Sequence, residues 1–282
     1  MRRKIDNTIR LTLLNLAFIA LCLVALIPIL YAAKVSFSGS SGLFSGTFSL
    51  LPKNFTFDNY LKLLSKEPFL TWLKNSVLLS VFTVLTALTV AVPASYAFSR
   101  FRFKGRRTVL YLLLLLNAFP AILSMTALYR ILNLTGLINK YSGLILIYSG
   151  TMAIFAIWNM KGYFDSIPVE IEEAAKVDGA NDAQLIARII LPLARPAIIV
   201  TSVMVLIYVW NEYIFSVIFM ISANGEKRTL AAGLYALQST EYTRNWPLFS
   251  AASILVTLPV LFIFFKIQKY MVSGLTAGGV KR

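Results

Sequence analysis

Six long stretches of apolar residues, separated by short polar segments, run along the 282-residue chain. A helix crosses the roughly 30 Å hydrocarbon core of a bilayer with about 20 residues. It also bonds its own backbone polar groups, which a lipid environment requires. The pattern therefore predicts an all-α integral membrane protein with six transmembrane helices, over residues 11–31, 74–99, 108–129, 142–160, 196–221 and 247–268. Four prolines within or near these spans predict kinks: Pro28, Pro93, Pro120 and Pro259.

The composition agrees with this class of protein. Hydrophobic residues make up 58% of the chain, mean hydropathy is +0.73, and only 14% of residues are charged, which excludes an ordinary soluble domain. A cleaved signal peptide is the alternative for the first stretch, but its apolar run is longer than a signal core, so an uncleaved anchor is favoured. Cys22, the only cysteine, lies in this stretch and is expected to be a small buried hydrophobe.

Most of the 27 Lys and Arg residues fall in four segments on one side of the predicted spans, at 2–10, 100–107, 161–195 and 266–282. Because cationic residues stay on the cytoplasmic side, both termini and the 161–195 loop are expected to face the cytoplasm of a bacterial or archaeal cell. The net charge of +15 is then mainly a topology signal, with some attraction to anionic membrane lipid. Its spread over several short loops disfavours nucleic-acid binding.

The 161–195 loop holds half of the 12 acidic residues of the chain. Pro168 suits the first turn of a helix, and Glu170 and Glu172 follow where the helix dipole favours anions. Gly179 is then expected to end this helix in a left-handed conformation. The loop is therefore predicted to start with a short polar helix.

A second helix is expected to begin at Asn181, whose side chain can form a capping box with Gln184, and to end before Pro192. Its apolar side consists of Leu185, Ile186, Ile189 and Ile190. On these grounds alone, the helix-turn-helix either folds back on its own bundle or docks against a partner outside the membrane.

The spacing of fixed residues in this loop resembles the EAA signature of ABC importer permeases. The matching residues are Glu173, Ala174, Ala175, Gly179, Ile189, Leu191 and Pro192. The resemblance implies that the loop is a coupling helix-turn-helix that sits in a cleft of an ATP-binding subunit. The chain has no histidine and no Gly-x-x-x-x-Gly-Lys-Ser/Thr loop, so it is expected to be a non-catalytic subunit. ATP and Mg would be held by partner subunits.

The carboxyl end, residues 270–282, resembles the tail of the six-span maltose permease in the carbohydrate branch of that family, although Arg282 stands where the family usually ends in glycine. The resemblance implies a second contact with the two ATP-binding subunits, through Gly274, Leu275, Thr276, Gly278 and Lys281. It also implies a heterodimer with a second, homologous permease and an external sugar-binding protein, periplasmic or lipid-anchored.

Glu212 is the only carboxylate expected inside a span, where a charge usually faces a cavity or a partner. Aromatic rings and hydrogen-bonding side chains suit sugar binding, so a substrate path is one hypothesis for Asn117, Tyr208, Trp210, Asn211, Glu212 and Tyr213. A structural polar pair, or an aromatic belt in the case of Trp210, is the other.

The external loop from about Ser222 to Asn245 is, by the same resemblance, able to reach into the cleft of the sugar-binding protein. Tyr235, Gln238, Tyr242 and Arg244 can compete there for sugar hydroxyls, or form an ordinary docking surface. The predicted function is import of oligosaccharides, with a maltodextrin type favoured. Import of a non-sugar solute and a proton-coupled secondary transporter that uses Glu212 are the alternatives.

Overall fold

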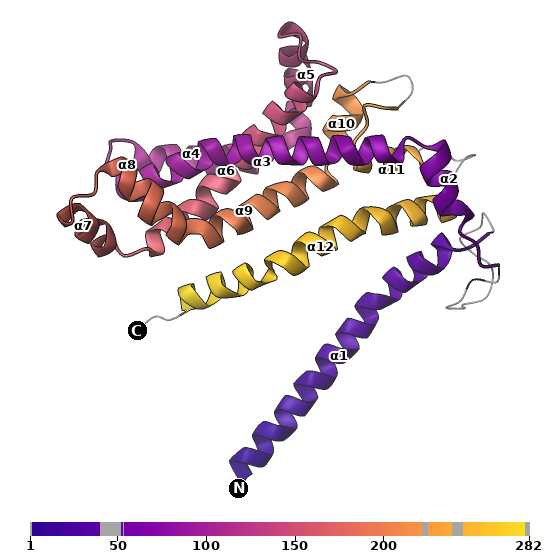
Figure 1. The fold of residues 1–282 in the computed structure, drawn as a ribbon, viewed down its shortest axis with the longest axis horizontal. Coiled ribbons are helices and arrows are strands. Elements are labelled where there is room, and N and C mark those ends of the chain that lie inside the picture. Colours follow the sequence, from indigo (N-terminus) through magenta and orange to yellow (C-terminus); the bar gives the residue numbers. More distant parts are fainter. Residues whose placement is uncertain (1, 40–51, 53, 222–224, 239–244, 280–282) are drawn as a thin grey trace. The chain divides into compact units, whose positions relative to one another are not determined.

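The computed structural model of the chain describes residues 2–39, 52, 54–221, 225–238 and 245–279, and these residues are mostly helical. The chain divides into two compact units, Met1–Phe69 with Leu234–Leu258, and Leu70–Gly233 with Pro259–Arg282. Figure 1 shows the helices in chain order: α1 (Arg2–Ser36), α2 (Asp58–Lys66), α3 (Phe69–Arg100), α4 (Arg106–Ala118), η1 (Ala121–Ser124), α5 (Met125–Leu134), α6 (Tyr141–Ser166), α7 (Val169–Val177), α8 (Asp182–Leu185), η2 (Ile186–Ile190), α9 (Leu191–Asn211), α10 (Ile214–Phe219), α11 (Leu230–Ala236) and α12 (Trp246–Gly279).

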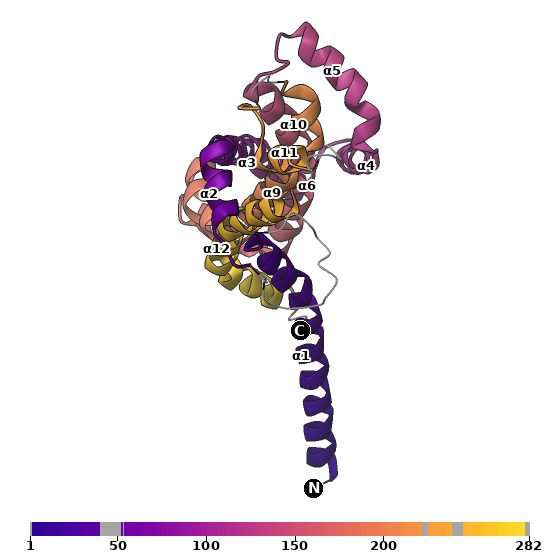
Figure 2. The same cartoon turned by 90° about the vertical axis from the view of Figure 1, so that its right-hand side faces the viewer.

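Five of these helical segments are long and apolar enough to cross a membrane, at Arg10–Ser36, Phe69–Arg100, Tyr141–Ser166, Asp182–Asn211 and Trp246–Tyr270. The third predicted span, residues 108–129, is instead a pair of helices, α4 and η1–α5, bent by 85° (Figures 1 and 2). Pro120 accounts for the bend, because it lacks a backbone N–H and holds Phe119 in an extended conformation. If this bent pair is one span, the total is six, as the sequence predicts.

The fifth span also differs from its predicted bounds of 196–221. Its helix runs from Asp182 to Asn211, and Glu212 then adopts an extended conformation before the short helix α10. The start is earlier than expected because the second helix of the polar loop continues into the span. The break at Glu212 separates the last part of the predicted span into a helix of its own.

The larger unit is built on α3, α6 and α9, which pack through small and branched side chains. Ala87, Met152 and Val205, one from each helix, form one buried cluster, and Figure 1 shows α6 and α9 side by side with α7 and α8 at one end. At the other end, Phe215 and Phe219 of α10 join Leu132 of α5 in a second cluster. Helices α7 and α8 thus lie at one end of a packed core formed by three helices.

In the smaller unit, α1 exposes most of its apolar side chains, and Cys22 is exposed rather than buried. The expectation for Cys22 is thus wrong with respect to this chain's described residues, because none of them covers the apolar stretch of α1 that contains it. Where α1 ends, Asn59 of α2 donates from its amide to the carbonyls of Ser36 and Ser38, both at 2.9 Å. These bonds join the start of α2 to the residues at the end of α1.

Candidate functional site

The predicted polar helix of the 161–195 loop is α7, which directly follows Pro168. Glu173 and Ala174 are exposed on it, whereas Glu172 and Ala175 are buried. The EAA residues are therefore split between two faces, because adjacent helical positions point about 100° apart. Of the EAA residues, the outward face carries one carboxylate beside a small side chain, which leaves room for close approach by another protein.

Gly179 ends α7 as predicted, with a φ of +86°. The N–H of Ala180 donates to the carbonyl of Ala175 at 3.0 Å, and the N–H of Gly179 donates to that of Lys176 at 3.1 Å. This pair of bonds is the Schellman motif, in which a left-handed residue satisfies the last carbonyls of a helix. The glycine thus sets the direction in which the chain leaves α7.

The capping box predicted at the start of the second helix is present. The amide of Gln184 donates to Asn181 Oδ1 at 2.9 Å, and the amide of Asn181 donates to Gln184 Oε1 at 3.1 Å. The expected end before Pro192 is wrong, because the π-helical turn η2 carries the chain from α8 into α9. A proline cannot donate to the carbonyl four residues earlier, and a wider turn before it accommodates the missing bond.

The apolar side of the second helix faces the larger unit's own core. Leu185 and Ile190 are each 1% exposed and pack with Phe164 and Ala194, and Ile189 is partly buried against the same cluster. Ile186 and Leu191 line an apolar cavity of about 350 Å³ beside them. Pro192 is exposed. The bundle therefore anchors α8, whereas Glu173 and Ala174 on the outward face of α7 stay exposed in the described part of the chain.

A buried ion pair that no local sequence pattern predicts connects α7 to the end of α3. Arg100 Nε lies 2.5 Å from Glu172 Oε1, and the two side chains are 10% and 8% exposed. Tyr96 donates its hydroxyl to Glu172 Oε2 at 2.9 Å. Removal of one partner from such a buried pair costs about 3–5 kcal/mol, because the other charge is left uncompensated. Glu172 lies three residues before Ala175, so the two side chains share one helical face, and both are buried. This spacing is the only sequence signal that Glu172 points inward.

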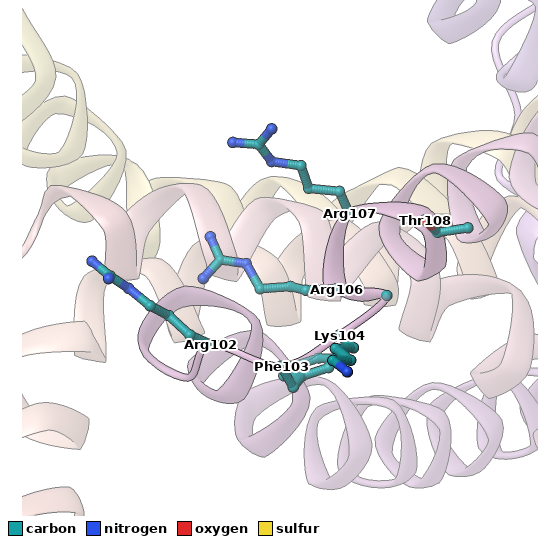
Figure 3. Close-up of a pocket in the computed structure, with 7 residues that line it drawn as sticks. Arg102, Phe103, Lys104, Arg106, Arg107 and Thr108 are labelled. Atoms are coloured by element: carbon teal, nitrogen blue, oxygen red, sulfur yellow. The ribbon is translucent and has the colours of Figure 1, made fainter.

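The loop between α3 and α4 is strongly basic, and residues 102–108 line an open pocket of about 710 Å³ there. Figure 3 shows the side chains of Arg102, Arg106 and Arg107 extending in the same direction from this loop. Gly105, with a φ of +85°, turns the chain into α4. One of the four basic segments that predict the topology thus lines this pocket with Arg102, Lys104, Arg106 and Arg107, next to the ion pair of Arg100.

The structure brings only some of the predicted substrate-path residues together. Glu212 accepts a hydrogen bond from the hydroxyl of Tyr148 in α6 and one from the amide of Phe215 at 2.8 Å. Tyr208 lies edge-on to Tyr148, with ring centroids 6.2 Å apart. Glu212 therefore links the end of α9 to α6 and α10, an arrangement that favours the structural interpretation of its charge.

The other members of that set lie apart. Trp210 is buried, with an indole N–H that has no partner among the described atoms, whereas Asn211 and Tyr213 are exposed. Asn117 is exposed in the last turn of α4, and no hydrogen bond joins it to these residues in the described part of the chain. The substrate-path hypothesis thus stays a prediction, with Asn117, Asn211 and Tyr213 exposed and Tyr208 and Glu212 partly exposed.

Two further predicted contacts fall partly outside the described residues. Tyr235 is exposed on α11, and the backbone N–H of Gln238 donates to its carbonyl at 3.0 Å, whereas Tyr242 and Arg244 lie outside the described part. At the carboxyl end, α12 runs beyond the expected span to Gly279. It includes the backbone of Gly274, Leu275, Thr276 and Gly278, and Lys281 lies outside the described residues.

Comparison with known proteins identifies the architecture. Residues 83–276, which include α7, α8 and the fifth span, match the family of binding-protein-dependent transport system inner membrane components. The chain belongs to this family. As a member, the permease is a multi-pass membrane protein, and its helical fold agrees with the predicted class.

Individual relatives cover nearly the whole permease. It is 38% identical to the galactooligosaccharides transport system permease protein GanQ of Bacillus subtilis, over 99% of this chain and 98% of that protein. It is 34% identical to the maltodextrin transport system permease protein MdxG of the same organism, over 100% of this chain and 97% of that protein. Among solved structures, a bacterial ABC transporter involved in import of the acidic polysaccharide alginate has a chain that matches with a TM-score of 0.75 at 29% identity. That match covers 92% of this chain and 95% of the other.

Proposed function

We propose that this permease is the membrane subunit of an ABC importer that moves oligosaccharides across the cytoplasmic membrane, with ATP and Mg bound and ATP hydrolysed on two separate subunits. The observation that carries the proposal is the open face of α7, where Glu173 and Ala174 are exposed on a helix whose other face is anchored to the bundle. Relatives that carry galactooligosaccharides and maltodextrin support a sugar substrate, with a maltodextrin type favoured.

Motion of α7 can reach the membrane spans through rigid connections. Asp182–Asn211 counts as one span of 30 residues, so α8 and α9 move together when a partner displaces α7. Gly179 holds α7 at a defined angle to this long helix. Closure of two ATP-binding subunits would then switch the bundle between inward-facing and outward-facing states by rigid-body motion. The carboxyl-terminal residues 274–281 are a second proposed contact with those subunits.

The external partners follow from the same proposal. A second, homologous permease would complete the transport path and cover apolar surface that this chain leaves exposed, such as Leu115 and Leu134. A sugar-binding protein would dock on the external side, near Tyr235 and Gln238. Tyr208, Asn211 and Tyr213 would contribute to the path for the sugar.

The test is ATP-driven uptake of a labelled oligosaccharide by the reconstituted complex, with ATP hydrolysis measured in parallel. Gly179→Val forces a β-branched residue into a left-handed conformation, which costs on the order of 1–2 kcal/mol or more. The ideal Cβ position there has no heavy atom within 4 Å, so backbone strain rather than collision is the cause. We expect this variant to insert normally but to hydrolyse ATP without matching uptake.

Gly179→Asn is the matched control, because asparagine tolerates left-handed φ, and it is expected to keep most of the uptake. Normal uptake by Gly179→Val would overturn the role of α7 as the coupling joint. Uptake by the permease alone, driven by a proton gradient without any ATP-binding subunit, would favour a secondary transporter instead.

A further inference from the structure

The ion pair between Arg100 and Glu172 lies outside the EAA signature but joins the coupling helix to a different membrane span. We propose that Arg100 is a positioning residue that ties α7 to α3, so that displacement of α7 moves α3 together with α6 and α9. This inference rests on the coupling role proposed above for α7.

Chain connectivity alone does not couple α3 to α7. Helix α7 is joined to α6 through Ile167 and Pro168, and to α9 through α8 and η2. Helix α3 is separated from α7 in sequence by α4, α5 and α6. Side chains must therefore transmit any motion of α7 to α3. Apolar contacts can slide past one another, whereas hydrogen bonds of fixed geometry resist sliding.

The bonds at Glu172 meet this requirement. Both of its carboxylate oxygens are held from α3, one by Arg100 Nε at 2.5 Å and the other by the Tyr96 hydroxyl at 2.9 Å. Arg100 Nη2 also donates to the carbonyl of Ile167 at 2.8 Å, in the linker between α6 and α7. The planar guanidinium thus bonds both to α7 and to the linker that precedes it. The low exposure of the ion pair limits competition from water.

A second branch of the network reinforces the end of α6. Ser99 Oγ accepts from Arg100 Nη1 at 3.1 Å and donates to Asp165 Oδ1 at 2.6 Å, and Lys161 Nζ lies 2.5 Å from Asp165 Oδ2. The last residues of α3 therefore hold both α6 and α7. Glu173, one position from Glu172, remains exposed, so the outward carboxylate can meet a partner while the inward one is tied to α3.

A cysteine pair tests this tether. The chain has a single cysteine, so Cys22→Ser provides a clean background for Arg100→Cys with Glu172→Cys. In the reduced complex we expect uptake per ATP hydrolysed to fall on the order of ten-fold, a size typical of coupling between sites. Treatment with a bifunctional thiol reagent, whose spacer replaces the removed side chains, is expected to restore most of the ratio. A misfolded protein would not recover in this way.

The exposed Arg102, in the basic loop beside the pair, provides the matched control, and Arg102→Cys is expected to keep the wild-type ratio. A wild-type ratio in the reduced pair, or a cross-linked pair that stays uncoupled, would overturn the tether. If Gly179→Val also transports normally, the coupling role of α7 itself fails. If Gly179→Val is uncoupled while the reduced pair is coupled, only the role of Arg100 fails.

Discussion

Glu212 illustrates how one charged residue can be accommodated at the end of a membrane span. Its carboxylate accepts from the Tyr148 hydroxyl and from the Phe215 amide, so it bonds to α6 and to the first turn of α10 at once. Tyr148 is fully buried. The carboxylate is thus satisfied by donors of the chain itself, and it takes up the Phe215 amide just after the helix breaks at Glu212.

Substitution of Glu212 separates the structural role from a role in proton transfer or substrate contact. Glu212→Gln keeps an acceptor for Phe215 and offers a donor to the Tyr148 oxygen, so we expect uptake and thermal stability close to those of the wild type. Glu212→Ala leaves the buried Tyr148 hydroxyl unpartnered, and it should cost about 1–3 kcal/mol of stability. Thermal unfolding in detergent and uptake by the assembled transporter measure the two effects. Loss of uptake in Glu212→Gln at unchanged stability would show that the charge itself is used.

At the scale of elements, the first turns of α3 hold the segment that leads into α11. The Trp72 indole donates to the Gly225 carbonyl at 2.9 Å, and the Asn75 amide donates to the carbonyls of Glu226 and Arg228 at 2.7 and 2.9 Å. The amide of Leu230 donates to Ser76 Oγ at 2.8 Å. A rigid helix thus supports the segment before α11, a contact over some 150 residues of sequence that no local pattern indicates.

Gly233 is the closest point of this contact, because a Cβ there would collide with the ring of Trp72, which is 1% exposed. Gly233→Ala is therefore expected to destabilise the permease by about 1–3 kcal/mol through overpacking and to weaken stimulation of ATP hydrolysis by the sugar-binding protein. Gly150→Ala on α6 is the control, since no heavy atom lies within 4 Å of its ideal Cβ, and a helical alanine should be neutral or stabilising. Equal thermal midpoints for the two variants would contradict the close contact.

At the scale of the whole molecule, the open question is the direction in which the spans cross the membrane. Basic residues at 2–10, 100–107, 161–195 and 266–282 predict that α7 faces the cytoplasm. The coupling proposal requires the same orientation, because ATP is available only on that side. The turn that precedes α2 would then be external.

Cysteine labelling tests this orientation in protoplasts or spheroplasts that express the permease in a Cys22→Ser background. Phe57→Cys, at a residue 58% exposed, should react with a membrane-impermeant maleimide in intact cells. Val177→Cys, at a residue 87% exposed on α7, should react only after permeabilisation. The reverse pattern would place α7 outside and exclude contact with a cytoplasmic ATP-binding subunit.

Much of the site was predictable because its signals are local. The capping box at Asn181 and Gln184 and the left-handed turn at Gly179 depend on a few neighbouring residues, and both are confirmed. The end of the second helix was not predictable from Pro192, since a π turn can accommodate a proline and let a helix continue. The inward direction of Glu172 was also missed, because its partner lies 72 residues away.

A helical membrane protein, most of its spans and the importer class could be predicted from the sequence alone. The signals are the apolar runs, the basic residues that flank them and the spacing of the EAA residues. Periodicity and composition carry this information because the bilayer imposes one length and one polarity on every span. Only the tertiary structure decided which carboxylates are tied inward, where the third and fifth spans break, and what holds the segment that leads into α11. Those features depend on hydrogen bonds and close contacts between distant segments, which no local pattern specifies.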